Sequence, residues 1–280
     1  MEILRSVAEL RQWSRQARSK GETVGIVPTM GALHSGHASL MRAARCACEA
    51  VAVSIFVNPT QFGPNEDYAR YPRTFEADCA LAQSEGAAVV FAPSVEEMYP
   101  AGAATFVEVA GLSDRLDGAS RPGHFRGVAT VVAKLLIASE ADKAFFGQKD
   151  AAQVAVLRRM VADLCLPAEL VVCPIVREAD GLALSSRNRY LSPEERAQAL
   201  VLSGTVRRVE ALAAAGERSA ESLIAAARQS FALEPAVRTD YIELVDWATL
   251  KPVEAAAPGS LFAVAAWVGA TRLIDNTILG

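Results

Sequence analysis

The stretch TVGIVPTMGALHSGH, residues 23–37, decides how the rest of the sequence is interpreted. Its first half is a short apolar run with β-branched residues, which predicts a buried strand. Its second half is a glycine-containing turn that leads into a helical pattern. A turn placed there lies at the carboxyl end of the strand and next to the N-terminus of the following helix. That position favours a bound phosphate.

The same pattern of short apolar runs repeats along the first 175 residues. Runs that predict strands buried on both faces of a sheet cover 23–28, 50–57, 87–93, 143–147 and 168–175. Between them, apolar residues at three- and four-residue spacing predict helices over 37–48, 74–85, 127–139 and 150–164. This alternation implies right-handed crossovers and parallel strands. We therefore predict an α/β fold, a Rossmann-like doubly wound parallel sheet, over residues 1–175.

From about residue 176 the pattern changes. Ser192, Pro193 and Glu195 combine an N-cap, a first-turn proline and a capping-box partner, and a long periodic stretch follows them. A second helix is expected over 219–232. Strands are expected over 239–246, 261–269 and 271–276. We predict a second, smaller α+β domain over residues 176–280.

Composition restricts the classes of function. The 280 residues carry a net charge of −4, which gives none of the basic surface that a nucleic acid requires. The first twenty residues lack the apolar segment of a secretory signal, and no run approaches the roughly 20 apolar residues of a membrane span. We expect neither a nucleic acid nor a membrane as partner. The five cysteines form no CxxC pair, so buried free thiols in a reducing cytoplasm are expected.

The chain has three histidines, and two of them, His34 and His37, lie three residues apart in the turn after the first predicted strand. The spacing resembles the outline of a phosphate-binding P-loop, but His37 and Ala38 stand where Lys and Ser or Thr are required. Neutral imidazoles can donate hydrogen bonds to an oxyanion. Two such donors suit negative charge that develops on phosphorus during attack. The alternative is that both histidines only cap their own helix.

Three further polar stretches follow predicted strands. In FVNPTQF (56–62), Pro59 turns the chain after Asn58 and directs Gln61 to the same edge of the sheet. FGQKD (146–150) places a lysine at a helix start, and LALSSRN (182–188) has two hydroxyls and a guanidinium that can wrap a triphosphate. Each stretch also has a purely local interpretation. The amides of 56–62 could satisfy nearby backbone groups, the lysine of 146–150 could be a solvated surface residue, and 182–188 could be an ordinary serine turn.

A fourth stretch, SRPGHFRG (120–127), places Arg121, His124 and Arg126 before a predicted helix. A structural salt-bridging loop explains these three residues nearly as well as a binding role does.

The motif HSGH (34–37) is similar to the HxGH signature of the superfamily that contains adenylylating nucleotidyltransferases and class I tRNA synthetases. Its neighbours resemble, in the same order, blocks of the pantothenate synthetase (pantoate–β-alanine ligase) family. These blocks are VSIFVNPTQF (53–62), EDYARYPR (66–73), RPGHFRGVATVVAKL (121–135), FGQKD (146–150) and DGLALSSRNRYL (180–191). The sequence departs from the family pattern at Gln148, where Glu is usual, and at AAQ (151–153), where a bulkier residue and a second Gln are usual.

The resemblance implies an ATP-dependent ligation of pantoate and β-alanine to pantothenate, on the coenzyme A pathway. The reaction would pass through pantoyl adenylate and release AMP and pyrophosphate. The resemblance also implies Mg²⁺ that enters with ATP and no metal site of the protein's own, a cytoplasmic location and a homodimer. Residues 1–175 would bind ATP and pantoate, and residues 176–280 would close over the site.

The resemblance further assigns individual residues. The catalytic set is His37, His34 and Lys149. The pantoate-binding set is Gln61, Gln153 and Asn58. The ATP-binding set is Met30, His34, His37, Gly147, Lys149, Asp150, Val176, Ser185, Ser186 and Arg187. The roles of Arg121, His124 and Arg126 are left open.

Two other functions compete with this hypothesis. A non-catalytic nucleotide-binding module could use the same fold, because fold alone does not imply chemistry. It would not need the substrate-side residues Asn58, Gln61 and Gln153. A fragment of an aminoacyl-tRNA synthetase is disfavoured by the acidic net charge and the small C-terminal domain.

Overall fold

The computed structural model describes residues 1–64 and 66–280. The chain divides into two compact units. The first comprises Met1–Gly147 and Val156–Cys173, and the second comprises Gln148–Ala155 and Pro174–Gly280. The sequence led us to expect the segment Gln148–Ala155 in the first domain, whereas in the structure it belongs to the second unit.

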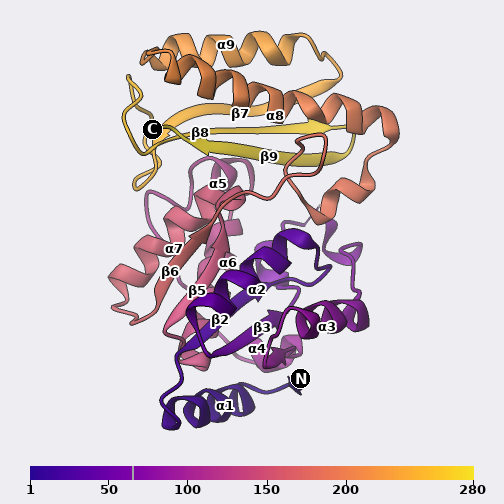
Figure 1. The fold of residues 1–280 in the computed structure, drawn as a ribbon, viewed down its shortest axis with the longest axis vertical. Coiled ribbons are helices and arrows are strands. Elements are labelled where there is room, and N and C mark those ends of the chain that lie inside the picture. The colour runs from indigo at the N-terminus through magenta and orange to yellow at the C-terminus, as the bar shows by residue number, and fades with distance from the viewer. Residues whose placement is uncertain (65) are drawn as a thin grey trace. The chain divides into compact units, whose positions relative to one another are not determined.

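The first unit is built on a parallel sheet of six strands (Figure 1). In the order β1-β4-β3-β2-β5-β6, the strands are Glu2–Leu4, Val89–Phe91, Ala50–Ile55, Val24–Thr29, Lys143–Gly147 and Glu169–Cys173. The chain runs outward from β2 through β3 to β4, and then returns to β5 on the other side of β2. The strand order therefore reverses between β2 and β5, where open α/β sheets bind ligands at the carboxyl ends of their strands.

Helices cover both faces of this sheet. Helices α2 (Ser35–Ala47) and α3 (Phe75–Ser84) share a buried cluster with the strands, in which Met41, Val53 and Phe145 are fully buried. Helices α1 (Val7–Ser19) and α6 (His124–Ser139) pack against each other and against β2, and they contribute no buried residue to that cluster. The two pairs of helices therefore lie on opposite faces, as a doubly wound fold requires.

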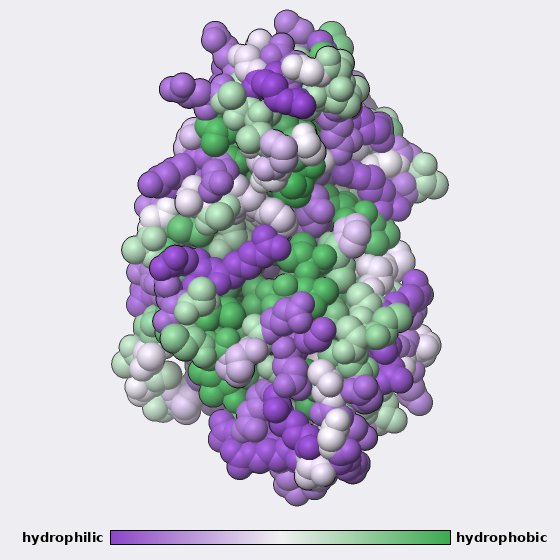
Figure 2. All heavy atoms as spheres, turned by 60° about the vertical axis from the view of Figure 1, so that its left-hand side comes forward, coloured by the Kyte–Doolittle hydropathy of each residue, from purple (hydrophilic) through white to green (hydrophobic). Residues whose placement is uncertain are grey.

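Three more helices carry residues of this unit. These are the short α4 (Val95–Met98) and α5 (Asp117–Ser120), and the longer α7 (Ala151–Asp163), whose first five residues belong to the second unit. The outer side of α1 is polar, with Arg15 and Arg18 exposed. Hydrophilic side chains accordingly cover the lower part of the view in Figure 2, where α1 lies in Figure 1.

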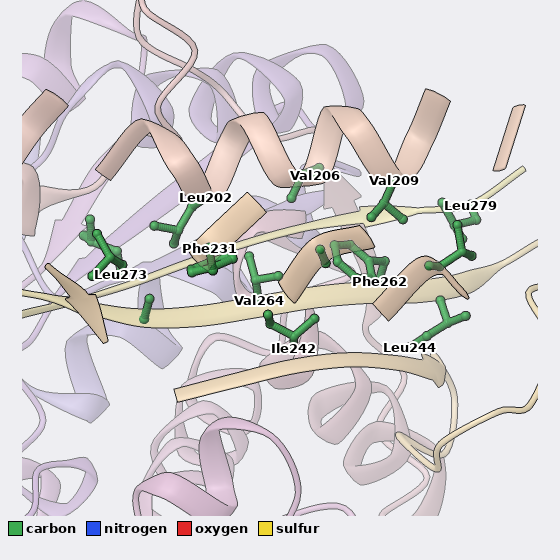
Figure 3. Close-up of a cluster of buried hydrophobic side chains, with 14 of the residues drawn as sticks. Leu202, Val206, Val209, Phe231, Ile242, Leu244, Phe262, Val264, Leu273 and Leu279 are labelled. Carbon is green, nitrogen blue, oxygen red and sulfur yellow. The ribbon is translucent and has the colours of Figure 1, made fainter. Parts of the chain in front are cut away.

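In the second unit, two helices pack on an antiparallel sheet. Helices α8 (Pro193–Ala214) and α9 (Ala220–Ala232) lie side by side against the strands β7 (Val237–Asp246), β8 (Ser260–Val268) and β9 (Thr271–Ile278) (Figure 1). Figure 3 shows the core between them, where Leu202 and Val206 of α8 face Phe262 and Val264 of β8. Helix α8 begins with the expected capping box, because the Ser192 hydroxyl accepts the Glu195 N–H at 3.1 Å.

The fold class predicted from the sequence is confirmed, and every predicted strand and helix is present. The strand predicted over 168–175 ends at Cys173, before Pro174, which has no N–H to donate to the sheet. The helix predicted over 127–139 begins earlier, at His124. Strand β1 and helix α1 were not predicted. The five cysteines are free, but Cys46 and Cys165 are exposed, so the expectation of uniformly buried thiols was wrong. Within the described residues, no helix combines the length and hydropathy needed to cross a membrane.

Candidate active site

The turn between β2 and α2 uses left-handed backbone conformations. Gly31 has φ of 81° and Ala32 has φ of 50°, and an alanine in this region costs about 1 kcal/mol. The N–H groups of Ala32 and Leu33 donate to the Asp78 carboxylate at 2.9 and 2.8 Å. The Thr74 hydroxyl donates to the same carboxylate at 3.0 Å. Asp78 is buried, so its charge-assisted hydrogen bonds offset the strain and hold the turn.

His34 and His37 form a capping box at the start of α2. His34 is the N-cap residue, and its Nδ1 accepts the Gly36 N–H at 3.2 Å. The Nδ1 of His37 accepts the His34 N–H at 3.3 Å, and the two ring centroids are 4.1 Å apart. A ring nitrogen that accepts carries no hydrogen, so in both neutral rings the N–H is at Nε2. Both histidines thus cap their own helix through Nδ1, while the hydrogen-bond donor of each ring is Nε2–H.

Gln61 lies in the turn after β3, at the end of the short 3-10 helix η1 (Pro59–Gln61). The Nδ2 of Asn58 donates to Gln61 Oε1 at 3.0 Å. This contact fixes which end of the Gln61 amide is oxygen, and the Nε2 end then lies 3.1 Å from the Sδ of Met30. Because a thioether is a weak acceptor, a ligand oxygen can replace it as the partner of Gln61 Nε2.

Asn58 has all its hydrogen-bonding capacity used inside the protein. Its Oδ1 accepts the Thr60 hydroxyl and the Tyr99 hydroxyl, each at 2.9 Å, and the Thr60 N–H at 3.3 Å. Its Nδ2 donates to the Gly127 carbonyl at 3.1 Å as well as to Gln61. The residue is 1% exposed. Asn58 therefore orients Gln61, and its own amide has no group left for a ligand. The sequence analysis did not identify Tyr99, the residue that completes this arrangement.

The first turn of α6 approaches η1 closely. A Cβ placed on Gly127 would lie 2.5 Å from the Thr60 carbonyl carbon and 2.6 Å from the Gln61 nitrogen. Only glycine permits this approach. One turn earlier, His124 Nδ1 lies 2.8 Å from the Gln61 carbonyl oxygen. The stretch SRPGHFRG thus lies directly against the predicted pantoate-binding residue.

Arg121 and Glu66 surround His124. Arg121 Nη1 lies 3.0 Å from His124 Nε2, and the same guanidinium makes two hydrogen bonds of 2.7 Å to the Glu66 carboxylate. Burial, and next the charge of Arg121, lower the pKa of His124 to about 4. Burial alone would raise the pKa of Glu66, but its hydrogen bonds and ion pair with Arg121 lower it below its usual value. Arg126, in contrast, stacks over the ring of Phe106 at 4.1 Å.

In the second unit, the 3-10 helix η3 (Gln148–Asp150) and the first turn of α7 carry Lys149, Asp150 and Gln153. Lys149 Nζ lies 3.4 Å from Asp150 Oδ1. The backbone of η3 is held by Asn276, whose Nδ2 donates to the Gln148 and Lys149 carbonyls at 3.1 and 2.8 Å. Gln153 is half-buried. The conformation around Lys149 is therefore fixed by a strand at the far end of the sequence.

The glutamine at position 148 suits its surroundings. Its Nε2 donates to Asn276 Oδ1 at 3.3 Å. Because Asn276 Nδ2 is used on two backbone carbonyls, its Oδ1 requires a donor, which an ionised glutamate could not supply. Gln148 thus satisfies Asn276 at the position where the resemblance led us to expect glutamate.

Residues 185–187 belong to a loop that folds back on itself. The Leu184 N–H donates to the Val176 carbonyl at 2.9 Å. The Ser185 hydroxyl caps the 3-10 helix η4 (Ser186–Tyr190) by accepting the Arg187 N–H at 3.3 Å. These backbone contacts place two hydroxyls and one guanidinium in consecutive positions of a tight turn.

Ion pairs fix the base of this loop. Arg196 of α8 donates to Glu178 at 2.8 Å and to Asp180 at 2.6 Å. Arg177 makes two hydrogen bonds, of 2.7 and 2.9 Å, to the buried carboxylate of Asp275. Hydrogen bonds within these pairs raise the pKa values of Arg177 and Arg196. The loop is therefore anchored on both sides of the serines.

The predicted site residues fall into two groups. One lies at or after the carboxyl ends of β2, β3 and β5 in the first unit and contains Met30, His34, His37, Asn58, Gln61 and Gly147. The other lies in the second unit and contains Lys149, Asp150, Gln153, Val176, Ser185, Ser186 and Arg187. In residues 1–64 and 66–280, three or more His, Cys, Asp or Glu side chains nowhere converge as metal ligands would.

Comparisons with known proteins cover both groups. The family model for pantoate-beta-alanine ligase matches residues 2–278. A pantothenate synthetase of Acidobacterium capsulatum is 65% identical over 284 residues, which cover 100% of this chain and 95% of that protein. The solved pantothenate synthetase of Thermus thermophilus has a TM-score of 0.94 and 47% identity, and the match covers 99% of each chain. A pantoate-beta-alanine ligase of Francisella tularensis, complexed with beta-gamma ATP and β-alanine, has a TM-score of 0.81 and 33% identity, with 99% of this chain and 97% of that chain covered.

Proposed function

The chain belongs to the pantoate–β-alanine ligase family, and from that membership we propose which residues perform each step of the family's reaction. The enzyme ligates pantoate and β-alanine to pantothenate at the expense of ATP. The pantoate carboxylate attacks the α-phosphorus of ATP and gives pantoyl adenylate and pyrophosphate. The amine of β-alanine then attacks the acyl carbon, and AMP leaves. This activity sets aside the hypotheses of a non-catalytic nucleotide-binding module and of a tRNA synthetase fragment.

The phosphates of ATP are held at the N-terminus of α2 in this proposal. There the Nε2–H groups of His34 and His37 donate, and the helix dipole adds a positive potential. Lys149 supplies a point charge to the phosphates, and the turn around Ser185 supplies hydroxyls and a guanidinium. The other proposed ATP contacts are Met30, Gly147, Asp150, Val176, Ser186 and Arg187.

Pantoate is held by amides that leave its carboxylate reactive. Gln61 Nε2–H donates to a pantoate oxygen in place of its weak contact with Met30 Sδ. Gln153 provides a second amide. Asn58 acts through Gln61, because its own donors and acceptors are used within the protein. A neutral amide orients an anionic nucleophile without the strong pairing that would lower its nucleophilicity.

The donors at the start of α2 contribute mainly to the first step. Attack on phosphorus passes through a crowded and more negatively charged state, and preorganised N–H groups stabilise charge where it develops. In the second step the charge develops first on the acyl oxygen. His34, His37 and Lys149 are therefore the residues that we propose as catalytic, by positioning and electrostatic stabilisation without a covalent enzyme intermediate.

Three broader features complete the proposal. Mg²⁺ enters with ATP and is bound mainly by phosphate oxygens and water, as is usual for this ion. The enzyme is cytoplasmic and forms a homodimer. The closing role of residues 176–280 stays a prediction from the resemblance.

One observation carries the assignment of the pantoate site, namely the Gln61 amide whose orientation Asn58 fixes. Replacing Gln61 by Ala should weaken the binding of pantoate by about 1–3 kcal/mol, since a buried polar contact is left unpaired. ATP affinity should stay the same. Calorimetric titration of each ligand measures both, with Gln16→Ala on the exposed side of α1 as the matched control. Equal losses for pantoate and ATP would refute the assignment. Formation of AMP only when ATP, pantoate and β-alanine are all present tests the overall reaction.

A further inference from the structure

We propose that His124 is a positioning residue of the pantoate site. The Nδ1–H of His124 holds the main chain of Gln61, and Arg121 holds the Nε2 of His124. This inference rests on the proposed role of Gln61 in binding pantoate. It assigns a role to the 120–127 stretch, whose function the sequence left open.

The neighbours of His124 select one tautomer of its ring. The Gln61 carbonyl oxygen, 2.8 Å from Nδ1, can only accept a hydrogen bond, so Nδ1 carries the hydrogen. The Arg121 guanidinium, 3.0 Å from Nε2, can only donate, so Nε2 carries a lone pair. Both neighbours therefore demand the same neutral form. The ring is 9% exposed, and its burial disfavours the charged form.

Arg121 is in turn held by the chain segment that carries Gln61. Its Nε and Nη2 each donate to the Glu66 carboxylate at 2.7 Å, and Nη2 also lies 3.4 Å from the Gln61 carbonyl oxygen. Arg121 and His124 thus hold this segment at two points, one at Gln61 and one at Glu66. A bidentate guanidinium–carboxylate pair fixes geometry as well as adding energy.

The side chain and main chain of Gln61 are consequently fixed by different partners. Asn58 sets the orientation of the amide, and His124 sets the position of the peptide from which the side chain extends. Loss of the His124 contact would leave the amide oriented by Asn58 but free to shift with its backbone. Since small displacements of a binding group cost much of its benefit, His124 should affect the use of pantoate without touching pantoate.

Two substitutions separate the two ring nitrogens. In His124→Asn, the amide nitrogen can occupy the place of Nδ1 and keep the hydrogen bond to Gln61. In His124→Gln, the amide reaches the place of Nε2 and keeps only the contact with Arg121. We expect His124→Asn to change the pantoate KM by less than about threefold, and His124→Gln to raise it about tenfold or more, with the ATP KM unchanged in both.

The comparison has clear contrary outcomes. An equal pantoate KM in the two variants, or a rise in the ATP KM as large as that for pantoate, would overturn the inference. Gln61→Ala is assayed beside them. If Gln61→Ala leaves the pantoate KM unchanged, the proposed role of Gln61 fails and this inference fails with it. If Gln61→Ala behaves as expected while His124→Gln is unimpaired, only the role of His124 fails.

Thermal unfolding of each variant shows whether it is folded under the assay conditions. Should His124→Gln be too unstable to assay, Glu66→Gln addresses the same contacts from the other side, because it weakens the hold on Arg121. It should raise the pantoate KM about threefold and leave the ATP KM unchanged. An unchanged pantoate KM in a folded Glu66→Gln enzyme would contradict the inference.

Discussion

Substitution of Gly127 by alanine should disturb pantoate binding more than it disturbs the fold. The added Cβ would lie 2.5 Å from the Thr60 carbonyl carbon and 2.6 Å from the Gln61 nitrogen. Ordinary carbon–carbon contacts begin near 3.5 Å, so the two backbones must separate by about 1 Å. Both neighbours are main-chain atoms, and no side-chain rotation can relieve the overlap. The displaced segment is the one that carries Gln61 and that Asn58 joins to the Gly127 carbonyl.

The magnitudes of the two effects differ. A small-to-large change in a packed site costs about 1–3 kcal/mol of stability. Replacing glycine by alanine inside a helix returns about 1 kcal/mol, so the net loss should be between about 0 and 2 kcal/mol. A misplacement of 1 Å at a binding group can cost about 100-fold in rate. The kcat/KM for pantoate should therefore fall by up to about 100-fold, equivalent to about 2.7 kcal/mol.

Steady-state kinetics with pantoate and ATP varied separately, together with urea unfolding, distinguish these effects. The matched control is Gly204→Ala in the interior of α8, where a Cβ would meet no atom within 4 Å. That variant should be as active as the parent and slightly more stable. The close approach of α6 to η1 does not position Gln61 if Gly127→Ala keeps the parent kcat/KM for pantoate. The same conclusion follows if its kcat/KM for ATP falls as much as its kcat/KM for pantoate.

Three further predictions concern the chemistry and the buried histidine. With ATP and pantoate but no β-alanine, pyrophosphate should appear in a burst of about one per active site; its appearance only after β-alanine is added would contradict the order of steps. His37→Ala should slow adenylate formation by about 10²–10³ in single-turnover assays and amide formation from pre-made pantoyl adenylate far less, while His37→Asn can keep the helix cap and so isolates the loss of Nε2. Because the pKa of His124 is about 4 in the folded protein against 6.5 ordinarily, the unfolded chain binds a proton that the folded chain does not bind between these pH values. The stability advantage of the parent over His124→Asn should thus be complete above pH 6.5 and shrink by up to about 3 kcal/mol towards pH 4, as urea titrations can measure. The charged groups that act on this ring are Arg121, Asp117 and Glu66. A stability difference between the two proteins that is independent of pH would contradict the burial of His124 in its neutral form.

Most elements of the fold could be predicted because their signals are local. Apolar runs marked five strands of the parallel sheet, β2 to β6, and Ser192 with Glu195 marked the start of α8. Helix α1 carries the same signal, since Ser6 and Glu9 form a capping box, so it could have been predicted. Strand β1 could not, because its two apolar residues, Ile3 and Leu4, form no apolar run and its place is set by pairing with β4.

In the candidate site, the residues that the sequence indicates most directly are those in the turns that follow strands. His34 and Gln61 stand in such turns, and their spacing to the strand is visible in the sequence. Asp78 and Tyr99 support those turns from 46 and 41 residues away along the chain, measured from Ala32 and Asn58. No local pattern distinguishes an aspartate that accepts two turn N–H groups from one that faces solvent. The supporting residues therefore required the tertiary structure.

The two interpretations of the histidine pair, helix capping and chemistry, describe opposite sides of the same rings. Capping uses Nδ1 of His34 and of His37 as acceptors. An acceptor at Nδ1 leaves the hydrogen of a neutral ring on Nε2. A serine and a glutamate in these positions would cap the helix equally well, as they do in α8, but a glutamate there would present negative charge at the proposed phosphate site. Histidine satisfies the helix N-terminus and still contributes a neutral donor. The cap thereby fixes the tautomer that the proposed adenylation step requires.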